Sequence, residues 1–241
     1  MSASLFKTIS LISVASAAIP LLVFILRWKH QPSQNRIIAL LLVCSIISDL
    51  VSWWLTTKET PTYIVENIYI VFAFILLNGF YYLILFQKKG KKILLIASCI
   101  FAIMLIVIAL TTGFGQVDSR FWVLCSGILA FNSILYFCSV PSMIVERYFD
   151  KYLFSNLVLN ASFLLYFFTS IILFIFMDFV FSQLTPNEAR SFWSIHNIIN
   201  VLKNLGIALA FFLSGKRNVY MTFSQLERIG RDQDKQRGLM N

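Results

Sequence analysis

Long apolar segments, separated by short polar connections, run along the chain as far as residue 213. Each has about the twenty residues that a helix needs to cross roughly 30 Å of hydrocarbon. No strand-like alternation competes with this pattern, and only helices or closed barrels satisfy their backbone groups in lipid. We therefore expect an all-α integral membrane domain, a bundle of seven transmembrane helices over residues 1–213, with spans at about 5–26, 37–55, 63–86, 93–110, 121–140, 154–177 and 192–213.

Composition supports the membrane class. Apolar residues make up 59% of the chain and charged residues only 13%, whereas about a quarter of a soluble domain is charged.

Near the N-terminus, Lys7 and Ala15-Ser16-Ala17 resemble a cleavable signal peptide. The apolar run continues through Pro20 to Leu26, so we expect an uncleaved first helix; cleavage would leave six helices. Pro141 is expected to close the fifth helix.

The net charge of +9 has a one-sided distribution. Fifteen Lys and Arg residues fall in the first, third and fifth connections and the tail, against Lys7, Lys58, Arg120 and Arg190 on the other side. The positive-inside rule then places the N-terminus outside and the C-terminus in the cytoplasm. We expect a multi-pass protein of the bacterial cytoplasmic (inner) membrane. Its partner is the lipid bilayer, and we expect no binding of nucleic acid.

The tail, residues 214–241, has a different character. Phe223, Leu226 and Ile229 recur every three residues among charged side chains. This spacing favours a short amphipathic helix that lies on the inner leaflet or on a cytoplasmic signalling partner. A frayed, solvated tail is the alternative.

The seventh segment contains FWSIHNIINVLKNLG, which is unusually polar for a membrane helix. On a helix with about 100° per residue, its polar side chains occupy an arc of about 120° and apolar residues fill the other side. Such a face must point into the bundle or at a cavity. Its candidate ligand-binding or relay residues are His196, Asn197, Asn200, Lys203 and Asn204.

The second helix carries a matching polar face around Asp49. If the second and seventh helices are neighbours, the depths of Asp49 and Lys203 allow an ion pair, direct or through water, because a lone charge at this depth is costly. The third helix adds Glu66 near the outer rim and Asn78 deeper in. Together these residues predict a polar funnel that opens outward and ends near Lys203 and Asn78.

No pattern in the chain indicates an enzyme. A catalytic zinc site needs three protein ligands, and the only two histidines, His30 and His196, are expected at opposite sides of the membrane. The four cysteines are not spaced as a redox or zinc pair. Hydrolase and phosphate-loop motifs do not occur. We therefore expect no catalytic site and no metal.

Seven helices, an outside N-terminus and a lysine in the last helix resemble microbial rhodopsins. The resemblance implies retinal bound to Lys203, with Asp49 or Glu66 as the acidic counter-ion. The family has an aspartate four residues before the lysine, where this chain has Ile199, and an arginine in the third helix, where residues 63–86 have none. We therefore expect no cofactor, with retinal as the alternative.

The run Trp193–Asn204 is similar to a group of uncharacterised bacterial seven-helix proteins that we associate with sensor kinases, which implies signalling. We favour a receptor-like or sensory protein with an outward-opening pocket for a small polar or anionic ligand. The alternatives are a small-solute or proton-coupled transporter and a structural subunit of a membrane complex; oligomers are compatible with each. A polar path through Asn78 and Asn160 would favour the transporter, and a plugged inner half the receptor.

Overall fold

The computed structural model describes residues 2–85, 87–111, 119–145 and 152–214. Within these ranges the protein is all-helical, and seven spans are long and apolar enough to cross a membrane. The predicted seven-helix class is confirmed at this level. The elements are α1 (Ala3–Ser16), α2 (Ala18–Leu26), the 3-10 helix η1 (Trp28–His30), α3 (Ser33–Thr57), α4 (Tyr63–Ile84), α5 (Lys88–Thr111), α6 (Ser119–Val145), α7 (Leu153–Ile175), α8 (Met177–Gln183) and α9 (Pro186–Ser214).

Two helices differ from the prediction at a proline. The first span is divided into α1 and α2 at Ala17, because Pro20 has no N–H to donate to the carbonyl of Ser16. By contrast, Pro141 does not close α6, which continues to Val145. Membrane helices tolerate a proline in their interior, and Pro141 leaves the Phe137 carbonyl without its usual helical donor.

A capping box begins α9 two turns earlier than expected. The backbone N–H and the hydroxyl of Thr185 both donate to the Glu188 carboxylate, at 2.9 and 2.7 Å. The Glu188 N–H donates in return to the Thr185 hydroxyl at 3.4 Å, and Pro186 stands at the first helical position, where no N–H is needed. These contacts start α9 at Pro186, six residues before the predicted start of the span at residue 192.

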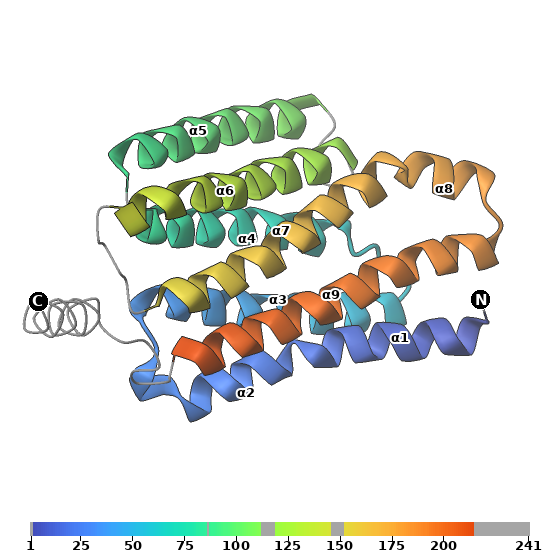
Figure 1. The fold of residues 1–241 in the computed structure, drawn as a ribbon. Coiled ribbons are helices and arrows are strands. Elements are labelled where there is room, and N and C mark those ends of the chain that lie inside the picture. The colour runs from blue at the N-terminus through green and yellow to red at the C-terminus, as the bar shows by residue number, and fades with distance from the viewer. Residues whose placement is uncertain (1, 86, 112–118, 146–151, 215–241) are drawn as a thin grey trace, which may run out of the picture.

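Six spans form a ring, and the seventh lies outside it. Around the ring, α3 packs on α4, α4 on α6, α6 on α7, and α7 on α9. The ring closes because α9 packs on α1 and α2, and α2 packs on α3. α5 covers α6 and α4 from outside (Figure 1). The interior of the ring is therefore where buried polar groups from different helices can meet.

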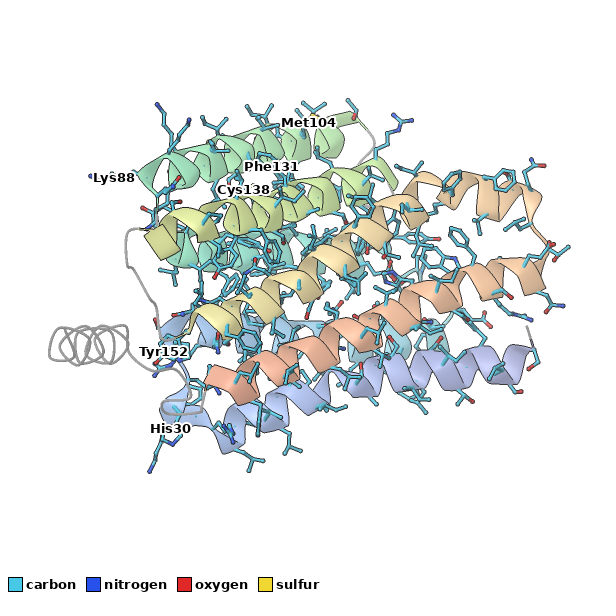
Figure 2. All side chains as sticks on the ribbon, viewed as in Figure 1. His30, Lys88, Met104, Phe131, Cys138 and Tyr152 are labelled. Atoms are coloured by element: carbon cyan, nitrogen blue, oxygen red, sulfur yellow. The ribbon has the colours of Figure 1, made fainter. Side chains whose placement is uncertain are left out.

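The two ends of the bundle differ in the connections that they hold. The N-terminus and the link between α8 and α9 lie at one end, and α9 finishes at the other (Figure 1). His30, Lys88 and Tyr152 lie at the end where α9 finishes (Figure 2). This is the arrangement expected of a chain whose first and third connections share a side with its tail.

Candidate functional site

The apolar side of α9 faces away from the bundle. Ile198, Leu202 and Leu205 keep 49%, 47% and 45% of their surface exposed. This confirms that the polar and apolar residues of the segment occupy separate sides. The polar side therefore faces the protein, where it divides into two parts with different neighbours.

One part of the polar side binds α1. The three asparagine side chains donate hydrogen bonds of 2.8–3.0 Å to serine hydroxyls. Both rows repeat every three or four residues, so they follow the axes of the two helices. We call these contacts the serine–asparagine ladder: Asn197 to Ser10, Asn200 to Ser13 and Asn204 to Ser16.

The ladder joins two helices. Interhelical hydrogen bonds in membranes contribute about 0.6 kcal/mol each, so three of them supply about 2 kcal/mol. The sequence grouped Asn197, Asn200 and Asn204 with Lys203 as candidate site residues. In the structure these three asparagines belong to the interface with α1. Their donors are engaged with α1.

The other part of the polar side faces aromatic residues of α7. The Lys203 ammonium lies 4.2 Å from the centre of the Tyr166 ring. The His196 ring lies 5.5 Å from that of Tyr166 and within 6.2 Å of those of Phe174 and Trp193. His196 Nδ1 is buried without a hydrogen-bond partner. Lys203 and His196 therefore share an aromatic environment, with Tyr166 in contact with both.

A small cavity lies inside the ring beside Lys203. Its volume is about 50 Å³, and residues of α3, α4, α6, α7 and α9 line it. Most of the lining is apolar or aromatic, and Lys203 is its one charged residue among those that the structure describes. Pockets for drug-sized ligands start at roughly 300 Å³, so this cavity does not fit retinal.

Asp49 lies within electrostatic reach of Lys203 but does not touch it. Each charge acts on the other, yet no ion pair joins them among the described residues. The assumption that their helices are close neighbours is wrong: α1 and α2 stand between α3 and α9 in the ring. The direct form of the predicted pair is therefore absent, and the water-bridged form stays a prediction.

Glu66 and Asn78 have local partners and do not line the cavity. Glu66 accepts a 2.7 Å hydrogen bond from the Thr62 hydroxyl at the start of α4. The Asn78 amide donates to the Phe74 carbonyl at 2.8 Å, and its oxygen accepts from Asn132 at 3.0 Å. Asn78 therefore ties α4 to α6. The structure brings neither residue into contact with Lys203.

A plug of large apolar side chains fills the interior between the cavity and the end where α9 finishes. Phe80, Tyr81, Leu159 and Phe163 are each no more than 2% exposed. The rings of Phe80 and Phe163 meet edge to face at 6.2 Å. These side chains come from α4 and α7, the two helices that flank α6 in the ring. Buried polar side chains lie on the same stretch of α7: Asn160 donates to the Asn156 carbonyl at 2.7 Å, and the side-chain oxygens of both asparagines have no hydrogen-bond partner.

The end of α9 is held by residues that the sequence did not single out. Gln31 donates to the Phe211 carbonyl at 2.8 Å and Arg27 to the Phe212 carbonyl at 2.8 Å. Asn35 donates to Gln31 at 2.7 Å and to Ser214 at 3.1 Å. Helix ends leave carbonyls without partners, and these side chains supply the donors. We call Arg27, Gln31, Asn35 and Ser214 the α9 latch.

Comparisons of the chain with models of known families, with curated proteins and with solved structures found no match. Within the described residues, no three His, Cys, Asp or Glu side chains come together to hold a metal ion. A functional assignment therefore depends on the geometry around Lys203.

Proposed function

We propose that the protein is a receptor-like or sensory membrane protein whose cavity beside Lys203 takes a small polar or anionic ligand. Lys203 carries the proposal. It places a cation inside the bundle, at the wall of a cavity, with an aromatic ring rather than a carboxylate as its neighbour. Ionisable groups in membrane interiors are costly and mark functional sites by default.

The helix that carries Lys203 also connects the cavity to the tail. α9 is continuous from Pro186 to Ser214, and Lys203 precedes its end by eleven residues, or about 16 Å. A ligand that draws Lys203 away from Tyr166 would move α9 against the latch. The tail lies outside the described residues; its sequence suits a helix on the inner leaflet or on a cytoplasmic partner, with a solvated tail as the alternative.

The plug supports a receptor over a transporter. A carrier needs its site to reach both sides of the membrane in turn, usually through discontinuous helices near the midplane. Here Phe80 and Phe163 are buried between the cavity and the end where α9 finishes, and α4 and α7 are continuous there. Trp122 and Phe174, stacked at 5.0 Å, line the cavity toward the start of α9. A ligand from outside would pass these two rings.

We further propose that the protein lies in a bacterial cytoplasmic membrane with Lys58 outside and Lys88 inside, as the charge distribution favours. Single Lys58→Cys and Lys88→Cys variants, in a background with the four native cysteines replaced by serine, test the orientation. A membrane-impermeant maleimide should label position 58 in intact cells and position 88 only after permeabilisation. The reverse pattern would contradict the proposed orientation.

The sensory role is tested in the native cell. We expect deletion of residues 219–241 and the Lys203→Met substitution to change the same set of transcripts, because both interrupt one route from cavity to partner. Membrane levels of each variant are measured by immunoblot, and Lys89→Met, at an exposed lysine, serves as the control. If the deletion left the transcripts and growth of the cells unchanged, the tail would not report and the sensory role would fail.

A further inference from the structure

We propose that the ligand of the Lys203 cavity is a small monovalent inorganic anion of the size of a halide or nitrate. This inference depends on the proposed function, because it names the ligand class of the same cavity. Charge, hydrogen-bond donors and volume each support it.

The cavity presents a positive charge that no carboxylate faces directly. Lys203 lines it, Asp49 does not, and the described residues form no ion pair with the ammonium. A Tyr166 ring at 4.2 Å offers a cation–π contact, which leaves the three N–H donors of the ammonium without a hydrogen bond to the described residues. An anion in the cavity would accept from this group.

Neutral donors complete the site. Ser126 and Ser170 line the cavity. The Ser170 hydroxyl is buried and makes no hydrogen bond within 3.5 Å, although the Tyr166 hydroxyl lies close enough to interact with it. Buried hydroxyls normally have a partner, because an unpaired one costs roughly 1–3 kcal/mol. Ring edges of the lining aromatic residues are positively polarised and suit an anion as well. A hydroxyl can turn its proton toward an anion, so Ser170 and Lys203 provide donors from two different helices.

The volume excludes most other ligands. A site of about 50 Å³ holds only a few probe spheres of water size, each of which needs about 10–15 Å³. Halide and nitrate ions fit this space, whereas a sugar, a nucleotide or an amino acid does not. A bound cation would face the Lys203 charge, which disfavours it.

Anion binding also gives Asp49 a role. At present the carboxylate of Asp49 and the ammonium of Lys203 attract each other across the interior. An anion beside Lys203 would take over as the counter-charge and would repel Asp49. Occupancy of the cavity would therefore weaken the attraction between α3 and α9. A shift of α9 that follows from this would reach the α9 latch at the end of the same helix.

The test titrates purified protein in nanodiscs with sodium bromide or sodium nitrate against sodium gluconate at constant ionic strength. The readout is the thermal unfolding midpoint, with quenching of tryptophan fluorescence by iodide as a second readout because Trp122 lines the cavity. Wild type should show a saturable rise in midpoint. Lys203→Met should bind at least about tenfold more weakly, since it removes a charge-assisted hydrogen bond, and Lys89→Met should bind like wild type.

Two milder variants keep the test decisive if Lys203→Met does not fold. Asp49→Asn should bind the anion several-fold more tightly, because it removes the competing negative charge, and Ser170→Ala should bind it more weakly. Unchanged anion affinity in these variants, or a wild type with no saturable response, overturns the inference. That result would not contradict the sensory role. The sensory role is contradicted if the tail deletion and Lys203→Met do not change the same transcripts, whereas absence of anion binding contradicts only the proposed ligand class.

Discussion

Replacing Gly206 by alanine should destabilise the protein more than any other glycine-to-alanine change among the described glycines. A Cβ at this position would lie 1.9 Å from the Ser162 hydroxyl oxygen and 2.9 Å from the Ser162 Cβ. Turning the hydroxyl away would break its 2.8 Å hydrogen bond to the Val158 carbonyl and would leave the clash with Cβ. Overpacking of this kind costs about 1–3 kcal/mol, so we expect a clear drop in the thermal unfolding midpoint.

Matched substitutions separate this clash from the general effect of alanine in a helix. A Cβ at Gly127 or Gly79 meets nothing within 4 Å, so Gly127→Ala and Gly79→Ala should be neutral or slightly stabilising. Adding Ser162→Gly to Gly206→Ala should restore stability, because the nearest Ser162 atom is then its Cα at 4.0 Å. Equal midpoints for Gly206→Ala and Gly127→Ala would show that α7 and α9 do not approach as closely as described.

The sequence predicted the spans well because membrane thickness sets their length. It also predicted which side of α9 faces the protein, since Lys203 and the asparagines cannot face lipid. It did not predict what each part of that side meets. The α1 serines that bind the asparagines are small residues, which suit a helix interface, a turn or a lipid-facing surface equally, so the sequence alone did not show the ladder.

The order of helices around the ring could not be predicted from the sequence, for a related reason. Short connections keep successive helices close, but they do not say which helix leaves the ring, as α5 does, or which one closes it. The distance between Asp49 and Lys203 depends on that order. Two local signals were present and informative: the capping box at Thr185–Glu188, and small residues every four positions at Gly206, Ala210 and Ser214, a spacing typical of close helix packing in membranes.

Close packing of α7 on α9 has a consequence for signalling. Ser155 donates to the Ala210 carbonyl at 2.8 Å, and Gly206 lies against Ser162, so α7 and α9 pack tightly toward the end where α9 finishes. Toward the start of α9, around His196 and Tyr166, the two helices contact each other through larger aromatic side chains. A ligand at Lys203 would therefore act near the boundary between the aromatic contacts and the tightly packed part of the α7–α9 interface.

Phe163→Ala should be the second severe change, and it tests the plug. Phe163 is 2% exposed, lines the cavity, and contacts the rings of Phe80 and Phe167. Truncation of a buried phenylalanine costs about 3–5 kcal/mol, and van der Waals packing is the main attraction between helices in lipid. Phe168→Ala on the same helix is the matched control, because Phe168 is 59% exposed.

The same pair of variants decides between the receptor and the transporter. Proteoliposomes loaded with a halide-sensitive dye should be tight with wild type and with Phe168→Ala, because both keep the buried rings of Phe80 and Phe163 in place. Phe163→Ala should let halide through, because it removes a ring that both lines the cavity and packs on Phe80 in the plug. A wild type that carries halide, with Lys203→Met abolishing the flux, would instead establish transport and would show that Phe80 and Phe163 move apart during function.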